Sequence, residues 1–254
     1  MAFEISGILG YRIIKNIGYL LLSGYSFNLV IMESIMPTVV VASPKGGAGK
    51  STTAVLLGTE LAHAGIEVSM LDCDPNRSLT LWSSRGPLPA RMEVLSDIGE
   101  SNIVKSIKAK EGDGRVVIVD LEGIASRLVS RAISQADLVI TPMRATTLDA
   151  TIGARALDLV AEEEEALDRM IRHAVVFTMT KAILSKQHKG IAASLRDQQV
   201  DLIDPPLMER AAFSAVFAYG GDLYSMPPQG NMERARENAA AFAQQVFKRL
   251  TEEA

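Results

Sequence analysis

Residues 39–53 read VVVASPKGGAGKSTT, a β-branched run followed by a glycine-rich loop and then by residues suited to a helix. The β-branched run predicts a buried strand. Glycines allow successive backbone N–H groups of the loop to turn toward one point, and a helix that begins near Lys50 adds the positive end of its dipole. We therefore predict a phosphate-binding loop, in which Lys50 neutralises phosphate charge and the Ser51 hydroxyl ligates Mg²⁺.

The loop departs from the strict phosphate-loop pattern GxxxxGK(S/T), because the first glycine of that pattern falls on Pro44. It reads KGGAGKST instead, which resembles the deviant Walker A motif of the ParA/MinD family of partitioning and positioning ATPases. The resemblance implies that Lys45 crosses the interface of an ATP-sandwiched dimer and reaches the phosphates bound by the other subunit. The residues that it implies for binding ATP are Lys45, Gly46, Gly47, Ala48, Gly49, Lys50, Ser51 and Thr52.

The composition limits the class of protein. The chain has 254 residues, which fits one large α/β domain with a continuous core. Its formal net charge is -4, so any binding to nucleic acid has to come from a local basic patch. Its single cysteine, Cys73, excludes a disulfide framework and a metal site held by paired cysteines, and it fits a reducing cytoplasm.

Residues 1–35 differ from the rest of the chain, being rich in Ile, Leu, Gly, Tyr and Ser without helix caps or a clear period. Their most apolar run, residues 17–32, contains polar side chains and is shorter than the roughly 20 residues that a membrane span needs. We expect residues 1–35 to be an extension, disordered or derived from a non-native start, and residues 36–254 to form the ATPase domain. A short anchor at a membrane interface is the alternative for the extension.

A second strand is predicted at residues 67–72, and it ends in the acidic stretch LDCDPN. Carboxylates at the carboxyl end of a parallel strand face the same crevice as the phosphate loop. The stretch resembles the D-x-D-P-Q box of the family, which implies that Asp74 lies near the γ-phosphate and the attacking water, with Asn76 in place of the usual glutamine. The alternative is that Asp72 and Asp74 only open a turn before Pro75.

A third strand, at residues 115–120, is an apolar run that ends in Asp120, as in a Walker B motif. At the tip of a buried strand, Asp120 can hold an Mg²⁺-bound water. Most ParA proteins continue with a proline two residues later, whereas this chain has Glu122. The departure resembles small plasmid ParA proteins and relaxosome-associated ATPases of agrobacterial type. Glu122 is either a solvated loop acid or a carboxylate that orients water.

The remaining pattern predicts a doubly wound, mostly parallel sheet with helices on both faces and one crevice at the strand ends. Helices are expected at residues 51–64, 146–165, 186–196, 208–217 and 231–250, and further strands at 136–142, 173–178 and 200–203. Residues 76–114 are polar and irregular, with a weakly helical piece around residues 98–108, and they carry no recognisable chemistry. Trp82, within them, is predicted to be a packed surface aromatic in preference to a platform on which a base stacks.

Segments near the carboxyl end also resemble the family. Residues 179–181, MTK, resemble the position where family members contact adenine, which implies a role for Thr180. Residues 209–213 and 219–221 resemble the C-terminal block, a region where basic residues bind DNA phosphates without reading sequence. The resulting DNA-binding candidates are Lys186, Lys189 and Arg210, with scattered surface charge as the alternative. The helix at 231–250 is followed by acidic residues, so a MinD-like membrane anchor is not expected.

Together, the resemblance implies an ATP-dependent DNA-partitioning ATPase with Mg²⁺ as cofactor. Such a protein forms a homodimer on ATP, binds non-specific DNA, and is reset when a ParB-like centromere-binding protein stimulates slow hydrolysis, so we expect it in the cytoplasm on the nucleoid. The catalytic residues that this implies are Lys45, Lys50, Asp74 and Asp120. The alternatives are a relaxosome or polar-positioning accessory ATPase, and a biosynthetic ligase with a deviant phosphate loop.

Overall fold

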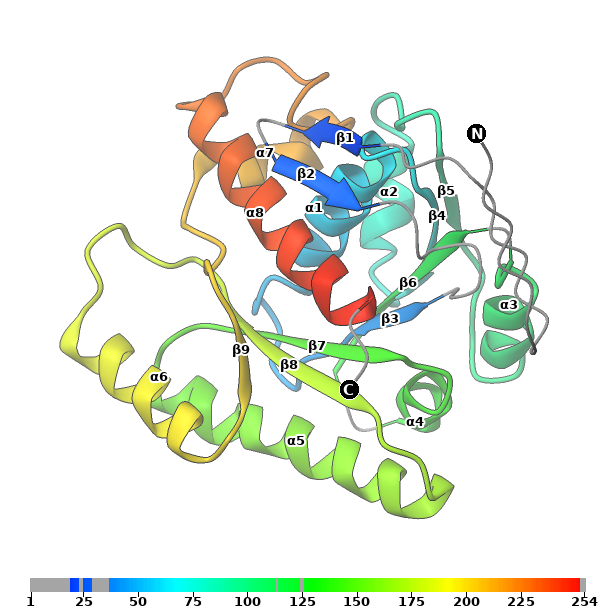
Figure 1. The fold of residues 1–254 in the computed structure, drawn as a ribbon. Helices are drawn as coiled ribbons and strands as arrows, with labels where there is room; N and C mark the ends of the chain where they lie inside the picture. Colours follow the sequence, from blue (N-terminus) through cyan, green and yellow to red (C-terminus); the bar gives the residue numbers. More distant parts are fainter. Residues whose placement is uncertain (1–18, 23–24, 29–36, 113, 124–125, 252–254) are drawn as a thin grey trace, which may run out of the picture.

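The protein is described by a computed structural model over residues 19–22, 25–28, 37–112, 114–123 and 126–251, with backbone alone at 19–22, 25–28 and 147–155. The first two segments form an antiparallel pair of strands, β1 (Tyr19–Leu22) and β2 (Tyr25–Asn28), separate from the main sheet (Figure 1). The division of the chain into an extension at 1–35 and an ATPase domain at 36–254 stays a prediction. Within the described residues, no helix has the length and apolar character needed to cross a membrane.

The main sheet is parallel throughout, in the order β5-β4-β6-β3-β7-β8-β9. Its strands are β3 (Thr38–Val41), β4 (Glu67–Cys73), β5 (Met92–Leu95), β6 (Arg115–Leu121), β7 (Leu138–Met143), β8 (Arg172–Phe177) and β9 (Asp201–Ile203). All residues of β3 are buried, as expected for a central parallel strand covered on both faces.

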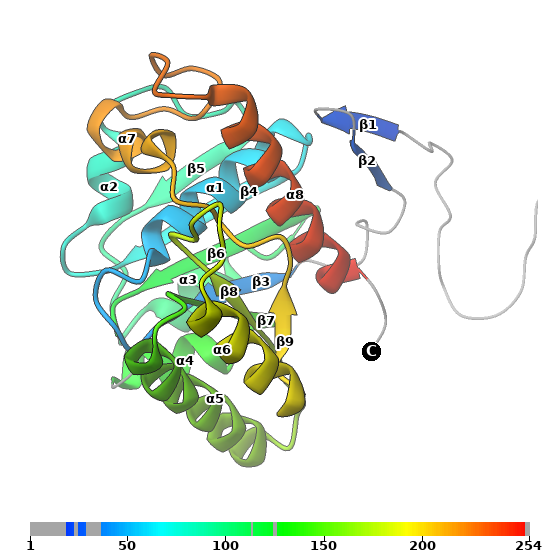
Figure 2. The same cartoon turned by 90° about the vertical axis from the view of Figure 1, so that its left-hand side faces the viewer.

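Helices cover both faces of this sheet, which makes a three-layer fold. They are α1 (Lys50–His63), α2 (Ser78–Ser83), α3 (Ile103–Lys108), α4 (Arg127–Ile133), α5 (Thr147–Leu167), α6 (Lys186–Asp197), α7 (Ala211–Tyr219) and α8 (Met232–Thr251). In Figure 2 the sheet lies between one layer of α1, α2, α7 and α8 and another that includes α4, α5 and α6. Val39 and Val41 pack into the first layer and Val40 into the second, because successive side chains of a strand point to opposite faces.

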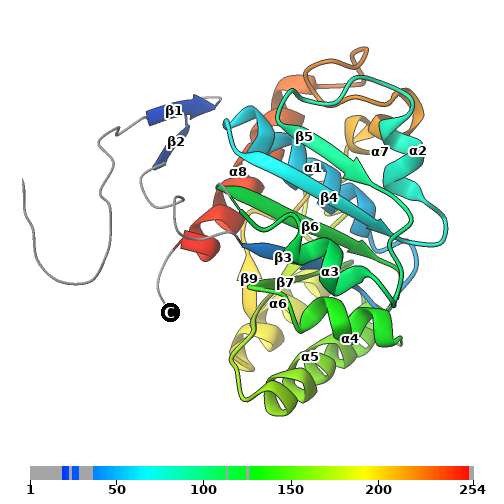
Figure 3. The ribbon, with the colours of Figure 1, turned by 90° about the vertical axis from the view of Figure 1, so that its right-hand side faces the viewer.

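The strand order reverses direction at β3, which lies between β6 and β7. From β3 the chain passes through α1 to β4 on one side, and from β6 it passes through α4 to β7 on the other (Figure 3). Ligands of open α/β sheets bind outside the carboxyl ends of the strands at such a reversal. The predicted doubly wound fold is confirmed, and the loop at residues 42–49 lies at this point.

The prediction for Trp82 is wrong, because its side chain is fully buried and belongs to the core. Its Nε1 donates a hydrogen bond of 2.8 Å to the carbonyl oxygen of Gly221. Beside it the backbones of Gly86 and Gly220 approach so closely that a Cβ on Gly220 would lie 2.3 Å from the Gly86 nitrogen. Through Trp82, α2 packs against the turn that follows α7. The segment at 76–114, expected to be irregular, contains α2, α3 and β5.

Candidate nucleotide site

The loop between β3 and α1 has the geometry of an anion site. Gly47 and Gly49 have φ angles of 71° and 92°, which side chains other than glycine rarely adopt. Helix α1 begins at Lys50, and its N-cap, Gly49, provides no side-chain hydrogen bond. The first N–H groups of α1 therefore have no capping side chain, and an anion placed there would satisfy them.

Lys50 lies over this loop and is 7% exposed. Its Nζ donates to the backbone carbonyl of Lys45 at 3.5 Å, so the ammonium group is next to the loop backbone. Lys45 itself is half-buried at the start of the loop. The predicted phosphate-contacting residues are contiguous in space as well as in sequence, although their roles stay predictions.

Asp120 faces the loop from the neighbouring strand, since it pairs in register with Val41 of β3 and Asp72 of β4. Burial raises the pKa of Asp120 to about 7, and the nearby carboxylates of Asp72 and Asp74 raise it further against the lowering effects of Ser51 and Lys50. Within the described structure neither oxygen of Asp120 has a hydrogen bond of good geometry, and the Ser51 hydroxyl is the nearest hydrogen-bonding side chain, close enough to lower the pKa.

A fully buried carboxylate without partners is unfavourable unless a cation compensates it. Carboxylate and hydroxyl oxygens are the ligands that Mg²⁺ prefers. The orphaned oxygens of Asp120 and the adjacent Ser51 hydroxyl therefore fit the predicted metal position.

The two carboxylates after β4 are held by local hydrogen bonds. Asp72 Oδ2 accepts from the backbone nitrogen and the hydroxyl of Thr80, at 2.7 and 2.6 Å. Asp74 Oδ1 accepts from the backbone nitrogen and Nδ2 of Asn76, at 2.7 and 2.9 Å. These are the contacts of a turn, and they leave Asp74 Oδ2 without a described hydrogen bond. Glu122 is exposed to solvent.

Thr180 follows β8, where its backbone bridges to Met208. Its N–H donates to the carbonyl of Leu207 at 3.1 Å, and its own carbonyl accepts from Glu209 at 2.8 Å. The side chain is 3% exposed, and in the described part of the chain its hydroxyl has no hydrogen-bond partner. A buried hydroxyl without a partner can accept a hydrogen bond from a polar ligand, and the predicted contact of Thr180 with adenine stays a prediction.

The three DNA-binding candidates belong to helices that pack on different faces of the sheet. Lys186 and Lys189 are exposed on α6, which packs with α5 on one face of the sheet, and the described residues include no ion pair to either lysine. Arg210 is half-buried at the start of α7, which packs with α1 and α2 on the other face. A hollow of about 160 Å³ between α6 and β9 is lined in part by Lys189, away from the loop.

Sequence reasoning missed two residues that contact the loop, Arg144 and Thr178. Arg144 Nη2 donates to the carbonyl of Gly47 at 2.9 Å, and Thr178 Oγ1 donates to that of Ala48 at 2.7 Å. Each is the first residue after a buried strand of the sheet, and that position is the only signal in the sequence.

Comparison with known proteins identifies relatives of the whole domain. A family model described as VirC1 protein matches residues 36–227. Protein ParA of Rhizobium radiobacter is 65% identical over 219 residues, which cover 85% of this chain and 99% of that protein.

Solved structures resemble the fold at low sequence identity. An ATP complex of a McdA variant from Cyanothece has a TM-score of 0.69 at 18% identity, covering 84% of this chain and 97% of that one. Cobyrinic acid a,c-diamide synthase from Mycobacterium smegmatis, with ADP and magnesium, has a TM-score of 0.63 at 16% identity, covering 84% and 95%. At these identities the likeness shows a shared fold.

Proposed function

The chain belongs to the VirC1 family of ParA-type ATPases, and from that premise we propose that it is a DNA-partitioning ATPase switched by ATP binding and hydrolysis. One observation carries the proposal: the buried carboxyl group of Asp120, which has no hydrogen bond of good geometry within the described residues, lies beside a glycine loop whose helix has no capping side chain. A cation and a phosphate chain would satisfy both groups at once. A nucleoside triphosphate with bound Mg²⁺ supplies both, the cation for the carboxyl group and the phosphates for the loop.

In this proposal the loop and Lys50 bind the phosphates, and Thr180 contacts the adenine. Ser51 and Asp120 would hold Mg²⁺, Asp120 through a water, and the metal when bound neutralises charge on the phosphates. Backbone N–H groups provide most of the remaining contacts, from the residues Gly46, Gly47, Ala48, Gly49 and Thr52.

Hydrolysis requires a positioned water and little covalent chemistry. Asp74 is the residue assigned to orient that water, and its free Oδ2 supports the assignment. Lys45 reaches across to the second subunit's nucleotide, so that ATP joins two copies of the chain. A ParB-like partner then stimulates slow turnover and resets the switch.

DNA binding is assigned to the dimer. Lys186 and Lys189 lie on α6, on one face of the sheet, and Arg210 precedes α7, which packs on the other face. A dimer can bring basic surfaces of two copies onto one DNA duplex, which links DNA binding to ATP even though the net charge is -4. This activity would place the protein on the nucleoid in the cytoplasm.

The experiment is binding to non-specific duplex DNA without nucleotide, with ADP and with ATP plus Mg²⁺, at low and raised salt. We expect binding with ATP only, weakened by salt because the contacts are to phosphates. Lys45→Ala should keep ADP binding and lose both ATP-dependent dimerisation and DNA binding. Absence of DNA binding in every state would favour an accessory ATPase that recruits protein partners.

Asp74→Ala supplies the second arm of this experiment. If Asp74 orients the water, the variant should form the ATP dimer and remain on DNA, because hydrolysis no longer resets it. Normal turnover in Asp74→Ala would assign the water to another residue.

A further inference from the structure

Two side chains hold the phosphate loop from the side of β7 and β8. Arg144 Nη2 donates to the Gly47 carbonyl at 2.9 Å, and Thr178 Oγ1 donates to the Ala48 carbonyl at 2.7 Å. They follow Met143 and Phe177, which are register partners at the ends of these adjacent strands. The sheet therefore places two donors side by side against two successive carbonyl groups of the loop.

Fixing a carbonyl group also fixes the N–H group that follows it. In a trans peptide, the C=O of one residue and the N–H of the next point in opposite directions within one plane. With its carbonyl held by Arg144, the Gly47 peptide directs the Ala48 N–H away from β7 and β8. The bond from Thr178 to Ala48 does the same for the Gly49 N–H.

Within the described residues, the Gly49 N–H group has no hydrogen-bond partner, and the Ala48 N–H group only closes the turn at residues 45–48, without a hydrogen bond of good geometry. Ala48 is 2% exposed, so its N–H is also largely withdrawn from solvent. Buried backbone donors are nearly always paired, which indicates that a ligand completes them. The orientation of these donors depends on Gly47 and Gly49, whose positive φ angles leave their peptides free to take other conformations.

We propose that Arg144 and Thr178 are positioning residues of the nucleotide site, and we call this pair the outer clamp. The outer clamp selects the loop conformation in which the Ala48 and Gly49 N–H groups face the phosphates. This inference rests on the proposed function, because it requires that the loop bind a nucleotide. The outer clamp acts through the loop and does not itself need to touch the nucleotide.

The two members contribute in different ways. Thr178 is 4% exposed, its N–H donates to the Met143 carbonyl at 2.8 Å, and its methyl group lies against Gly49. Arg144 is exposed and charged, so its effect combines a hydrogen bond with a positive charge near the phosphates. Thr178 is neutral, so losing its hydroxyl changes no charge; the same hydroxyl also lies 3.3 Å from the Met143 carbonyl oxygen, a weaker contact than the one to Ala48.

The test measures ADP affinity of the full chain by calorimetry in variants that lose or keep each donor. Thr178→Val and Arg144→Met remove the donor and preserve approximate shape, whereas Thr178→Ser and Arg144→Lys keep a donor. We expect each loss variant to bind ADP about tenfold more weakly, as for loss of about one hydrogen bond. The donor-keeping variants should remain within about threefold of the original affinity.

Two matched controls separate positioning from general destabilisation. Thr141→Val removes a buried hydroxyl of β7 that contacts His173 at 2.9 Å and not the loop. Arg169→Met removes a guanidinium that donates to the carbonyls of Ser134 and Ala136, at 3.1 and 3.0 Å, far from the loop in sequence. Both controls should leave ADP affinity unchanged, whatever they do to the thermal unfolding midpoint.

The outcomes distinguish this inference from the function on which it rests. If the unaltered protein binds no ADP, the proposed function and the outer clamp are both wrong. If it binds ADP and the loss variants bind equally well, only the outer clamp is wrong. Equal weakening by Thr178→Val and Thr178→Ser would also overturn it, because the hydroxyl would then be irrelevant. Should Thr178→Val not fold, the exposed Arg144 series decides the question.

Discussion

At the amino-terminal end of α1, Thr53 and the adjacent Asp120 have buried oxygens without described partners, whereas at its carboxyl-terminal end Glu60 and His63 join a network. Burial raises the pKa of both Asp120 and Glu60 to about 7. The two carboxyl groups therefore have similarly raised pKa values, although their hydrogen-bonding surroundings differ. Both oxygens of Asp120 lack a described hydrogen-bond partner, and they lie beside the glycine loop. Glu60 accepts a hydrogen bond from Tyr224 at 3.2 Å on Oε2, and only its Oε1 is without a described partner.

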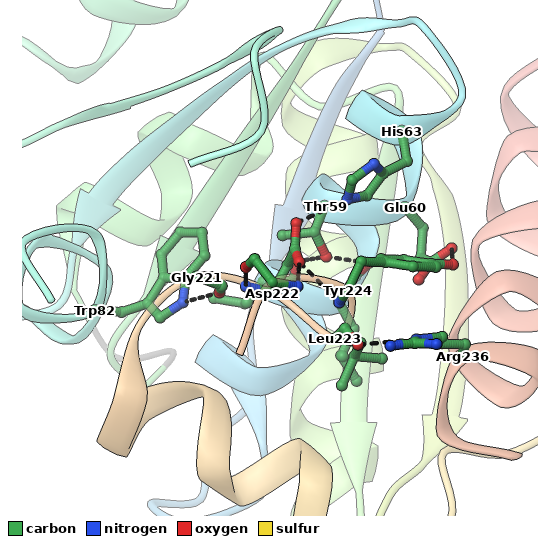
Figure 4. Close-up of polar contacts among 12 residues, drawn as sticks. Thr59, Glu60, His63, Trp82, Gly221, Asp222, Leu223, Tyr224 and Arg236 are labelled. Carbon is green, nitrogen blue, oxygen red and sulfur yellow. Dashed lines mark hydrogen bonds and ion pairs between the residues drawn. The ribbon is translucent and has the colours of Figure 1, made fainter. Parts of the chain in front are cut away.

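The network at the carboxyl-terminal end of α1 joins three parts of the chain, as Figure 4 shows. His63 Nε2 donates to Asp222 Oδ2 at 2.7 Å, and Arg236 of α8 lies over the Tyr224 ring at 4.9 Å. Burial alone would raise the pKa of Asp222. Hydrogen bonds from His63, Tyr224 and Ser225 outweigh this effect and hold that pKa at about 2. The network is a structural joint between α1, the loop at 221–225 and α8.

The comparison teaches that a perturbed pKa does not by itself identify a functional site. What distinguishes the amino-terminal end of α1 is that its unpaired groups lie beside a glycine loop and a helix start without a capping side chain. At the other end, the charged groups largely satisfy one another. Variants at the two ends should therefore separate ligand binding from stability.

Lys50→Ala should have the largest effect and should act on ligand binding alone. Removal of the ammonium group leaves the phosphates without their nearest cation, so ADP and ATP affinity should fall by about a hundredfold or more, or about 3 kcal/mol. Calorimetric titration measures this. Lys110→Ala, which removes a partner of Glu93 at the sheet edge, is the control and should bind nucleotide normally. Retained ATP affinity in Lys50→Ala would refute the assignment of the loop.

Asp222→Ala should show the opposite behaviour. It removes the acceptor of His63 and of the backbone N–H groups of Tyr224 and Ser225, so the free energy of unfolding should fall by about 3 kcal/mol. Urea unfolding measures this, and ADP affinity should not change. Asp97→Ala, which breaks an exposed pair with Arg77, should change stability by less than about 1 kcal/mol. A loss of ADP affinity in Asp222→Ala would mean that the two ends of α1 are coupled.

Glu60→Gln tests the pH dependence of the network. The folded pKa of about 7 lies above the unfolded value of 4.5, so the native state binds more protons between these values and stability falls as pH rises through them. Glu60→Gln removes this loss and should be about 3 kcal/mol more stable than the original protein at about pH 8, with little difference below about pH 4.5. Urea unfolding across this range measures it, with Glu162→Gln on exposed α5 as control. A difference independent of pH would contradict the assignment.

Thr53→Val should have the smallest effect. The Thr53 hydroxyl is buried without a described partner, whereas Thr59, on the same helix, donates to the Val55 carbonyl at 2.8 Å. Replacing Thr53 by valine should raise the free energy of unfolding of the ligand-free protein by about 1 kcal/mol, because an unsatisfied hydroxyl is removed. Thr59→Val, measured in the same thermal scans, should not stabilise. Equal changes in both variants would show that the hydroxyl of Thr53 is satisfied in solution.

Local signals made most of the fold predictable. β-Branched runs identify the central strands, and the predicted helix at 51–64 differs from α1 by one residue at each end. By contrast, β5 at Met92–Leu95 has no distinctive pattern, and its place at the sheet edge depends on pairing with β4. The burial of Trp82 depends on Gly221, which is 139 residues away in the sequence.

The residues of the candidate site also fall into those that local sequence predicts and those that depend on tertiary contacts. The loop residues and Asp120 are predictable because each is attached to a strand whose pattern is visible in the sequence. Arg144 and Thr178 were missed because their contacts arise from the register of β7 and β8, which no local pattern encodes. That Lys186 and Arg210 belong to helices on different faces of the sheet was also not predictable, because the sequence does not specify which face each helix covers.

Trp82 is the single tryptophan of the chain, and its indole is fully enclosed between α2 and the turn at Gly221. Its fluorescence is therefore an optical probe confined to one layer of the molecule. Loss of that layer would move the indole into water and shift its emission to longer wavelength, while fraying of α6 on the other face would leave the spectrum unchanged. Comparing this emission with far-ultraviolet circular dichroism during unfolding would reveal whether the two helical layers unfold together or one after the other.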